Sequence, residues 1–126
     1  MNNKKLQGLV AYFSGHAAET RARKYLEMKG YRFVAQNVKE KRGSGACELD
    51  LIMEDKKVLV FIEVKKRKTT ELASFSVSSI MQKRLYKGAE VFLAQHQNYQ
   101  NFDCRFDVVL FDENDNITHL KNVIEE

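Results

Sequence analysis

The chain has 126 residues, of which 44% are hydrophobic and 30% are charged, and its formal net charge is +4. This length and composition are typical of one globular domain and exclude an intrinsically disordered protein. No apolar run approaches the ~20 residues that a membrane span needs, and no apolar segment follows the basic residues 1–5. We therefore expect a cytoplasmic protein without a signal peptide.

The cysteine and histidine residues indicate neither a disulfide framework nor a zinc site. Cys47 and Cys104 lie far apart and form no paired-cysteine zinc pattern. The histidines, His16, His96 and His119, form no HxH or HExxH arrangement, which argues against zinc-dependent hydrolysis. We interpret Cys47 as a small buried thiol.

The first predicted element is a helix from Ser14, its expected N-cap, to Lys29, with Gly30 as the residue that ends it. An apolar stripe at helical spacing is formed by Ala18, Ala22, Tyr25 and Leu26. Glu19 lies in the first turn at the border of this stripe. From the residues alone it is either a partner of the helix dipole, worth up to about 1 kcal/mol, or a side chain that leans toward a sheet.

Three strands are predicted next. Tyr31–Val38 is a short strand, and a basic glycine-rich loop connects it to a hairpin. The hairpin strands are Cys47–Met53 and Val58–Lys66, because both are rich in branched or aromatic apolar residues and polar residues bound them.

A two-residue loop, Asp55-Lys56, sets the predicted register of this hairpin. It places Asp50 opposite Phe61 and Glu48 opposite Glu63. One face then carries Glu48, Asp50, Glu63 and Lys65, and the other is a core face of Leu49, Leu51, Met53, Val58, Val60, Ile62 and Val64. An odd-numbered loop would split this core face, which favours the even loop.

The charged face of the hairpin is a candidate site for a divalent metal ion. Carboxylates that lie within a few ångströms of each other cannot all stay ionised without a cation. Mg²⁺ needs only one or two carboxylates together with water and substrate phosphate. Lys65 would then orient the attacking water or stabilise charge in the transition state. Ordinary salt bridges at exposed strand ends remain the alternative that the residues leave open.

Basic residues lie near these acids, and the net charge weakly favours a polyanionic partner. One cluster, Lys39, Lys41 and Arg42, precedes Gly43-Ser44-Gly45, and the other, Lys65, Lys66, Arg67 and Lys68, follows the second hairpin strand. We expect both clusters at the end of the hairpin that carries the acids, where they suit a phosphate backbone. Two solvated charge runs are the alternative.

A second helix and two strands complete the predicted fold. The helix spans Ser78–His96, with a capping box between Ser79 and Gln82. Its buried face is formed by Met81, Leu85, Ala89 and Phe92. Strands follow at Arg105–Phe111 and Asn116–Leu120. The element order is αβββαββ, which predicts one compact α/β domain over all 126 residues.

Several of these segments match motifs of a known family. The matching blocks are Gly15-x-x-x-Glu19-x-x-Ala22-x-x-Tyr25-Leu26-x-x-x-Gly30-Tyr31 with Asn37, Glu48-Leu49-Asp50-Leu51-Ile52, Val60-Phe61-Ile62-Glu63-Val64-Lys65-x-Arg67, Gln82-Lys83, and Arg105-Phe106-Asp107-Val108-Val109. Together they resemble the YraN-like bacterial proteins over nearly the whole chain. That family is assigned to the PD-(D/E)xK nuclease superfamily and is similar to archaeal Holliday-junction resolvases. The resemblance implies a restriction-endonuclease-like core, with a mixed central sheet flanked by helices.

The resemblance also implies a role for each site residue. Asp50 and Glu63 would hold Mg²⁺ or Mn²⁺, Glu19 would contact the ion directly or through water, and Lys65 would position the nucleophile. Gln82 would be a further catalytic residue on the second helix. The expected nucleic-acid-binding residues are Lys39, Lys41, Arg42, Lys66, Arg67, Lys68 and Lys83.

Two positions of the first hairpin motif carry less specific expectations. Cys47 stands where the family commonly has glycine, and a side chain there narrows the approach of a phosphate. Glu48 matches the family motif but is not a catalytic position of the superfamily. It is either an outer-shell residue of the site or, as we prefer, part of an ordinary surface or hairpin salt bridge.

The implied function is metal-dependent endonucleolytic hydrolysis of structured DNA, branched or single-stranded, in repair or recombination. A symmetric homodimer is expected by analogy, because one small domain would hold a four-way junction less well. Two other classes of function stay open. One is a nucleic-acid-binding protein that keeps the fold without turnover, and the other is a protein-interaction module whose acids are structural.

Overall fold

The structure is a computed structural model that describes residues 17–42 and 45–124. Of residues 40–42 and 45–47 it describes the backbone alone. The first helix covers residues 17–28 of the described part, so the predicted N-cap Ser14 lies outside it. The other elements are β1 (Arg32–Arg42), β2 (Gly45–Asp55), β3 (Val58–Lys66), α2 (Thr69–Leu72), α3 (Ser79–Gln95), a 3-10 turn (Gln97–Tyr99), β4 (Asp103–Phe111) and β5 (Ile117–Leu120). None of the described helices is long and apolar enough to cross a membrane.

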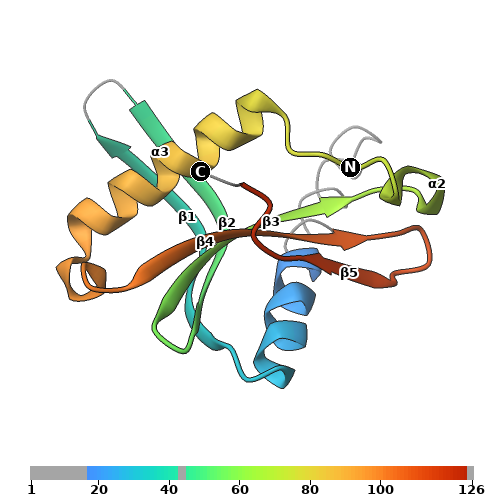
Figure 1. Ribbon diagram of the computed structural model, residues 1–126, viewed down its shortest axis with the longest axis horizontal. Helices are drawn as coiled ribbons and strands as arrows, with labels where there is room; N and C mark the ends of the chain where they lie inside the picture. Colours follow the sequence, from blue (N-terminus) through green and yellow to red (C-terminus); the bar gives the residue numbers. More distant parts are fainter. Residues whose placement is uncertain (1–16, 43–44, 125–126) are drawn as a thin grey trace, which may run out of the picture.

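The five strands form one mixed sheet in the order β1-β2-β3-β4-β5. Strands β3 and β4 are parallel, whereas the other neighbouring pairs are antiparallel. The connection between the parallel strands contains α2 and α3, as a parallel pair requires. Figure 1 shows α3 on one side of the sheet and the N-terminal helix on the other. This arrangement confirms the predicted α/β class and is consistent with a restriction-endonuclease-like core.

Two hydrophobic clusters, one on each face of the sheet, hold the helices in place. On the α3 side, Phe61 and Ile52 of the sheet pack with Leu85 and Phe92 of the helix. On the other side, Leu51 and Ile62 pack with Ala22 and Leu26 of the N-terminal helix, as its apolar stripe predicted. Because the central strands are buried on both faces, their sequences are nearly continuous apolar runs.

The ends of both long helices follow from local backbone chemistry. Gly30 ends the first helix with a φ of +94°, a conformation that glycine adopts without a steric penalty, as predicted. At the start of α3, Ser78 is the N-cap and accepts a hydrogen bond from the Met81 N–H at 3.1 Å. The predicted capping box on Ser79 and Gln82 is therefore wrong by one residue.

The predicted hairpin register is also wrong, although the predicted parity is correct. The loop residues are Lys56 and Lys57, with φ values of +49° and +66°, and Asp55 pairs with Val58. This shift lets β3 start at the first apolar residue and leaves both lysines in solvent. Because the register moves by two residues, the alternation of faces along β3 is unchanged. Phe61 lies opposite Ile52 and not opposite Asp50.

The described residues on both sides of the predicted basic glycine-rich loop are paired as antiparallel strands. Strand β1 continues through Arg42, which pairs with Gly45 at the start of β2. Figure 1 shows this paired end of β1 and β2 and the end of β3 on opposite sides of the molecule. We expected the two basic clusters to meet at one end of a hairpin, and this prediction is wrong.

A buried carboxylate in β4 ties the C-terminal part of the sheet together. Asp107 is fully buried, and its Oδ1 accepts hydrogen bonds from Arg105 Nε and the Asn122 N–H, both at 2.9 Å. Its Oδ2 accepts from Arg105 Nη2 at 3.1 Å and lies 2.7 Å from His119 Nε2. One side chain thus joins β4 to β5 and to the segment after it.

The same network reaches the other end of the chain through Arg105. Its Nη2 also donates to the Tyr31 hydroxyl at 2.8 Å, and its Nη1 lies 3.4 Å from Asp55 Oδ2. Burial raises the pKa of Asp107, but the hydrogen bonds from His119, Arg105 and the Asn122 N–H outweigh burial and lower the pKa below its usual value. The ionised carboxylate is therefore the form that the fold stabilises.

We expect Asp107→Asn to lower the free energy of unfolding at pH 7 by about 3 kcal/mol, because it removes the charged partner of a buried pair. The stabilisation by Asp107 is present above the unfolded pKa and is lost as the pH falls through the lower folded pKa. The free energy of unfolding of the variant should therefore fall less steeply than that of the wild type as the pH is lowered into the acid range. Urea denaturation from pH 3 to pH 7 measures both effects. The exposed Asp103→Asn, on the same strand, is the matched control, and equal stability of the two variants would contradict this role.

Candidate acidic site

The candidate site lies where β2 separates from β3. Their paired residues run from Asp55 and Val58 to Leu51 and Ile62. Beyond that point, the Val64 N–H donates to the Asp50 carboxylate at 2.9 Å. The Asp50 side chain thus replaces a backbone acceptor, and it lies beside the stretch of β3 that carries Glu63.

The neighbouring strand β1 is irregular at the same position. Gln36 pairs with Leu51 and Val38 with Leu49, so Asn37 lies opposite Asp50. Asn37 has a φ of +54°, in the left-handed region that asparagine tolerates better than most residues. On β2, Leu49 packs in the α3-side cluster, whereas Leu51 packs in the other. The prediction that Leu49 shares the core face of Leu51 and Met53 is therefore wrong.

Glu63 is the most deeply buried acid of the site, with a side chain that is only 4% exposed. Two cations compensate its charge. Lys65 Nζ lies 3.2 Å from Glu63 Oε1, and Arg84 Nη2 forms an ion pair with the same oxygen. Both cationic side chains remain partly exposed, at 31% and 39%. The site is thus open to solvent on the side of the cations.

Glu19 approaches these acids from the N-terminal helix. Its Oε2 is buried and has no hydrogen-bond partner among the described residues. Burial, followed by the charges of Asp50 and Glu63, raises the pKa of Glu19 to about 7, and Lys39 lowers it in part. Glu19 therefore leans toward the sheet, which the sequence left open, and this environment favours its protonated form.

Asp50 has the same kind of environment. Burial and then the charge of Glu63 raise its pKa, against the opposing effects of the Val64 N–H, Arg84 and Lys65. The structure thus brings Glu19, Asp50, Glu63 and Lys65 into one site, from two strands and one helix. Within the part of the chain described, no three His, Cys, Asp or Glu side chains are close enough to ligate one ion as they stand.

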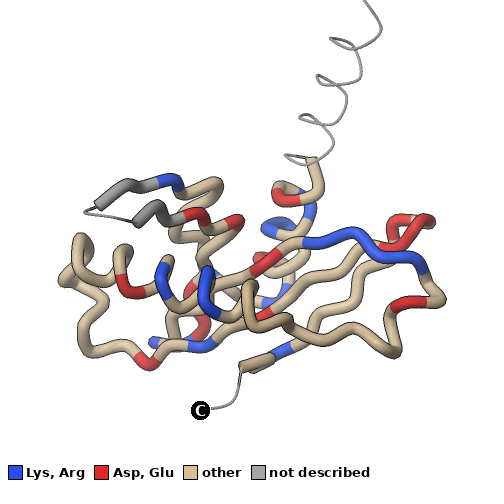
Figure 2. The backbone as a smooth tube through the Cα atoms, turned by 90° about the horizontal axis from the view of Figure 1, so that it is seen from above, with Lys and Arg blue, Asp and Glu red and all other residues tan. Residues whose placement is uncertain are grey.

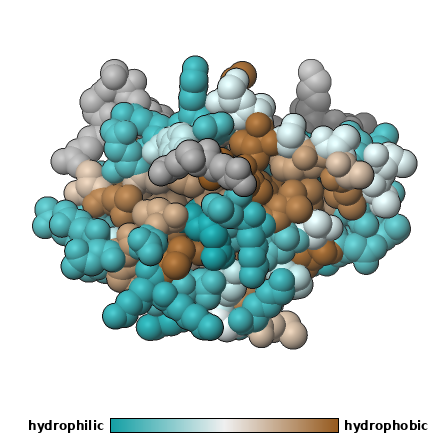
Figure 3. All heavy atoms as spheres, viewed as in Figure 1, coloured by the Kyte–Doolittle hydropathy of each residue, from teal (hydrophilic) through white to brown (hydrophobic). Residues whose placement is uncertain are grey.

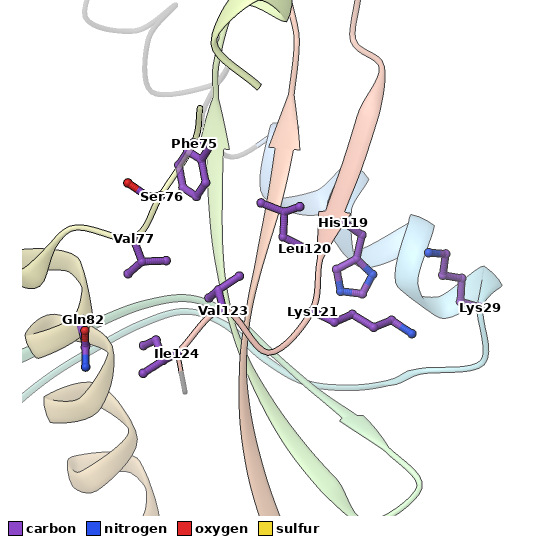
Figure 4. A pocket seen from close by; sticks show the side chains of 10 residues that line it. All are labelled: Lys29, Phe75, Ser76, Val77, Gln82, His119, Leu120, Lys121, Val123 and Ile124. Carbon is purple, nitrogen blue, oxygen red and sulfur yellow. The ribbon is translucent and has the colours of Figure 1, made fainter. Parts of the chain in front are cut away.

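Gln82 lines a cavity that none of these acids lines. This cavity has a volume of about 730 Å³, and Val77, Ile124 and residues of β5 also line it. Figure 4 shows Gln82 on α3 at one end of this cavity, with His119 and Lys121 toward the other. Figure 3, which has the viewpoint of Figure 1, shows apolar residues at the surface in the middle of the face, with hydrophilic residues around them. The catalytic role of Gln82 stays a prediction.

Glu48 and the first basic cluster lie along the β1–β2 hairpin. Glu48 is exposed and pairs in register with Lys39, so opposite charges face each other across the two strands. This position suits the hairpin salt bridge that we preferred for Glu48. The side chains of Lys41, Arg42 and Cys47 lie outside the described residues.

The second basic cluster continues from the end of β3. Figure 2 shows a stretch of Lys and Arg where β3 leads toward α2. The Arg67 guanidinium lies 5.7 Å from the centre of the Phe75 ring, and the Arg67 N–H donates to the Phe111 carbonyl at 2.9 Å. Lys66 and Lys68 are exposed beside it, as is Lys83 on α3. Their predicted contacts with nucleic acid are therefore sterically open.

Arg84 is the site residue that the sequence analysis missed. It lies three residues after the buried Met81 and one before the buried Leu85, at the edge of the apolar face of α3. This spacing places a side chain at the border between helix and sheet. The sequence therefore contained a signal for a charged residue beside the sheet, but nothing identified Glu63 as its partner.

Comparisons with known proteins give one consistent family. The model of the uncharacterised protein family UPF0102 matches residues 18–111, a range that includes all four residues of the acidic site. A UPF0102 protein of Klebsiella pneumoniae subsp. pneumoniae is 43% identical over 126 residues, covering 98% of this chain and 94% of the relative. A UPF0102 protein of Enterobacter sp. (strain 638) is 45% identical over 116 residues, covering 90% and 85%. The UPF0102 protein YraN of Escherichia coli O157:H7 is 43% identical over 105 residues, covering 81% and 77%.

We expect Glu19→Gln to stabilise the metal-free protein at pH 8 by about 1 kcal/mol, allowing for solvent screening. The folded pKa of Glu19 is raised to about 7, so its favourable contribution is present below the unfolded pKa and is lost as the pH rises through 7. The neutral amide avoids this loss, and the two proteins should be equally stable near pH 4. Urea denaturation in EDTA at both pH values tests the prediction. The control is Glu27→Gln, which changes an exposed residue of the same helix and should give no such gain. An unchanged stability of Glu19→Gln at pH 8 would contradict the prediction, because it would mean that the acids lie far apart in solution.

Proposed function

The chain belongs to the UPF0102 family, and we propose that it is a metal-dependent endonuclease that hydrolyses phosphodiester bonds in structured DNA. The membership confirms the resemblance to YraN-like proteins. The observation that carries the proposal is the buried Glu19 Oε2, which has no hydrogen-bond partner among the described residues and lies near two further carboxylates. A buried oxygen in an acidic environment is stabilised by a cation. A member of the PD-(D/E)xK superfamily is expected to have such a site.

The donor set fits a hard divalent cation, because it consists of carboxylate oxygens alone. Asp50 and Glu63 would hold Mg²⁺ or Mn²⁺, and Glu19 would contact the ion directly or through water. The ion, when bound, supplies a Lewis acid and lowers the pKa of a bound water. Since the described carboxylates are not close enough for three of them to share one ion as they stand, binding would draw them together.

Lys65 is placed to act on the nucleophile. Its amine lies 3.2 Å from the Glu63 carboxylate and remains partly exposed to solvent. A protonated amine at this position would orient a water molecule and stabilise the negative charge that develops on the phosphorus oxygens. Because Lys65 and Glu63 are two residues apart on one strand, their side chains stay on the same face whether or not an ion is bound.

The two basic clusters support DNA as the partner. They lie on opposite sides of the molecule, at the paired end of β1 and β2 and after β3, so a backbone that contacts both would cross the region between them. Phosphate contacts of this kind fix the position of DNA without reading its sequence. We therefore propose that the protein recognises DNA by its shape, that the substrate is branched or single-stranded, and that the protein acts in the cytoplasm. A homodimer, which would present two such sites, is part of the same proposal.

One observation favours a second candidate, a nucleic-acid-binding protein without turnover. Glu63 is already paired with Lys65 and Arg84, and the described residues contain no ready three-ligand metal group. In that case the cations replace the metal permanently. The basic clusters would still bind DNA, and binding would not depend on Mg²⁺ or Mn²⁺.

We expect the wild-type protein to cleave labelled four-way junction, flap or single-stranded DNA in Mn²⁺ or Mg²⁺. Asp50→Asn and Glu63→Gln should each reduce the rate about a thousandfold or more, because bound metal contributes several kcal/mol to the transition state. Gel assays with plain duplex as a comparison substrate measure both the rate and the preference. Glu90→Gln, an exposed acid on α3 that pairs with Lys87, is the control and should cleave normally. DNA binding without cleavage, equal in all variants, would support the second candidate instead.

We expect Arg67→Gln combined with Lys68→Gln to weaken DNA binding to a similar degree for every sequence. Each lost phosphate contact should reduce the slope of log K against log salt by about 0.9. Fluorescence anisotropy between 50 and 200 mM salt measures this slope. Lys24→Gln removes a charge from the exposed face of the N-terminal helix and should leave the slope unchanged. Equal slopes for all three proteins would exclude the second basic cluster from the DNA interface.

A further inference from the structure

We propose that Arg84 is a built-in counter-ion of Glu63, which a divalent cation displaces when it binds to the acidic site. The proposal rests on the proposed function, since it concerns the same carboxylates. It assigns a role to a residue of α3 outside the predicted site. It also explains how a buried carboxylate is stabilised while no metal is bound.

The first argument is the number of cations at one oxygen. Both Lys65 Nζ and Arg84 Nη2 contact Glu63 Oε1. A carboxylate with a side chain only 4% exposed needs a nearby positive charge, because burial disfavours the ionised form. Lys65 supplies one such charge from the same strand. Arg84 adds a second charge, so Glu63 keeps Lys65 as a partner when Arg84 moves away.

The second argument is that Arg84 is held incompletely. Its Nε is buried and has no hydrogen-bond partner among the described residues. Arg105 provides the contrast within the same fold, since its Nε, Nη1 and Nη2 all have acidic or hydroxyl partners. An unpaired buried donor opposes the position in which it is held. Arg105 is therefore held at three nitrogens, whereas Arg84 is held by the Glu63 carboxylate and leaves its Nε unpaired among the described residues.

The third argument concerns which cation can leave. Lys65 lies on β3, two residues from Glu63, and the paired strand β4 fixes its backbone. Arg84 reaches Glu63 from α3 with a long side chain that is 39% exposed, so it has a path to solvent. Like charges repel strongly in a partly buried site, so a divalent ion on Glu63 excludes the guanidinium. The displaced guanidinium would then face the solvent side, where substrate phosphate approaches.

The test is Mn²⁺ binding measured by calorimetry on the full chain without DNA. Arg84→Gln should bind Mn²⁺ about tenfold more tightly than the wild type, which corresponds to about 1.4 kcal/mol. Arg84→Lys, which keeps the charge, should stay close to the wild type. Lys87→Gln removes a charge from the same helix one turn further on, where Lys87 pairs with Glu90, and should change the affinity less than twofold. Asp50→Asn should lose Mn²⁺ binding.

The possible results separate this proposal from the proposed function. If the wild type and Arg84→Gln bind Mn²⁺ equally and Asp50→Asn does not bind, the metal site stands and the role of Arg84 is overturned. A weaker affinity in Arg84→Gln also overturns it, because Arg84 then helps to form the site. If neither protein binds Mn²⁺, both proposals fail. Thermal melting in EDTA confirms that each variant is folded, and Mn²⁺ should raise the melting temperature of Arg84→Gln more than that of the wild type.

Discussion

The separation of β2 from β3 at Asp50 is the constraint on which the candidate site depends. A backbone N–H inside a sheet needs an acceptor, and at Val64 the acceptor is the Asp50 carboxylate. Strand β3 keeps its position because it stays paired with β4 along its whole length, from Val58 to Lys66. Beyond this point the backbone of β3 is therefore not paired with β2 among the described residues, but it stays paired with β4. The acids lie where the pairing of β2 with β3 would otherwise continue.

The environments of Asp107, which is buried, and of Glu19, which is partly buried, have opposite consequences for stability. Asp107 accepts four hydrogen bonds or ion pairs, its pKa is lowered, and its charge stabilises the folded state. Glu19 has an unpaired buried oxygen and a pKa raised to about 7, so its charge opposes folding at neutral pH. The first environment is typical of a structural residue. The second is typical of functional sites, where stability is lower than the fold allows.

Residue patterns predicted the parts of the fold that depend on side-chain alternation and helix periodicity. The burial of Leu26 and Leu85 and the shared face of Glu63 and Lys65 follow from these periods alone. These periods do not specify the register of the β2–β3 hairpin, because a shift by two residues leaves the same side chains on each face. The pairing of Arg84 with Glu63 depends on how α3 packs over the sheet, which no local pattern specifies. The role proposed for Glu19 rests on the family resemblance, since a first-turn glutamate has an ordinary local explanation.

The distribution of charge places a demand on any anionic partner. The carboxylates of the site repel a phosphate, so DNA can approach only if cations neutralise them. Lys65 and Arg84 pair with Glu63 and offset the raised pKa of Asp50 only in part, and Glu19 also keeps a raised pKa. Of the two basic clusters, Lys39 offsets the raised pKa of Glu19 only in part, and Lys65 is already paired with Glu63. A divalent ion would supply the missing charge at the point where the phosphate must lie, which is the physical reason why DNA and metal are proposed together.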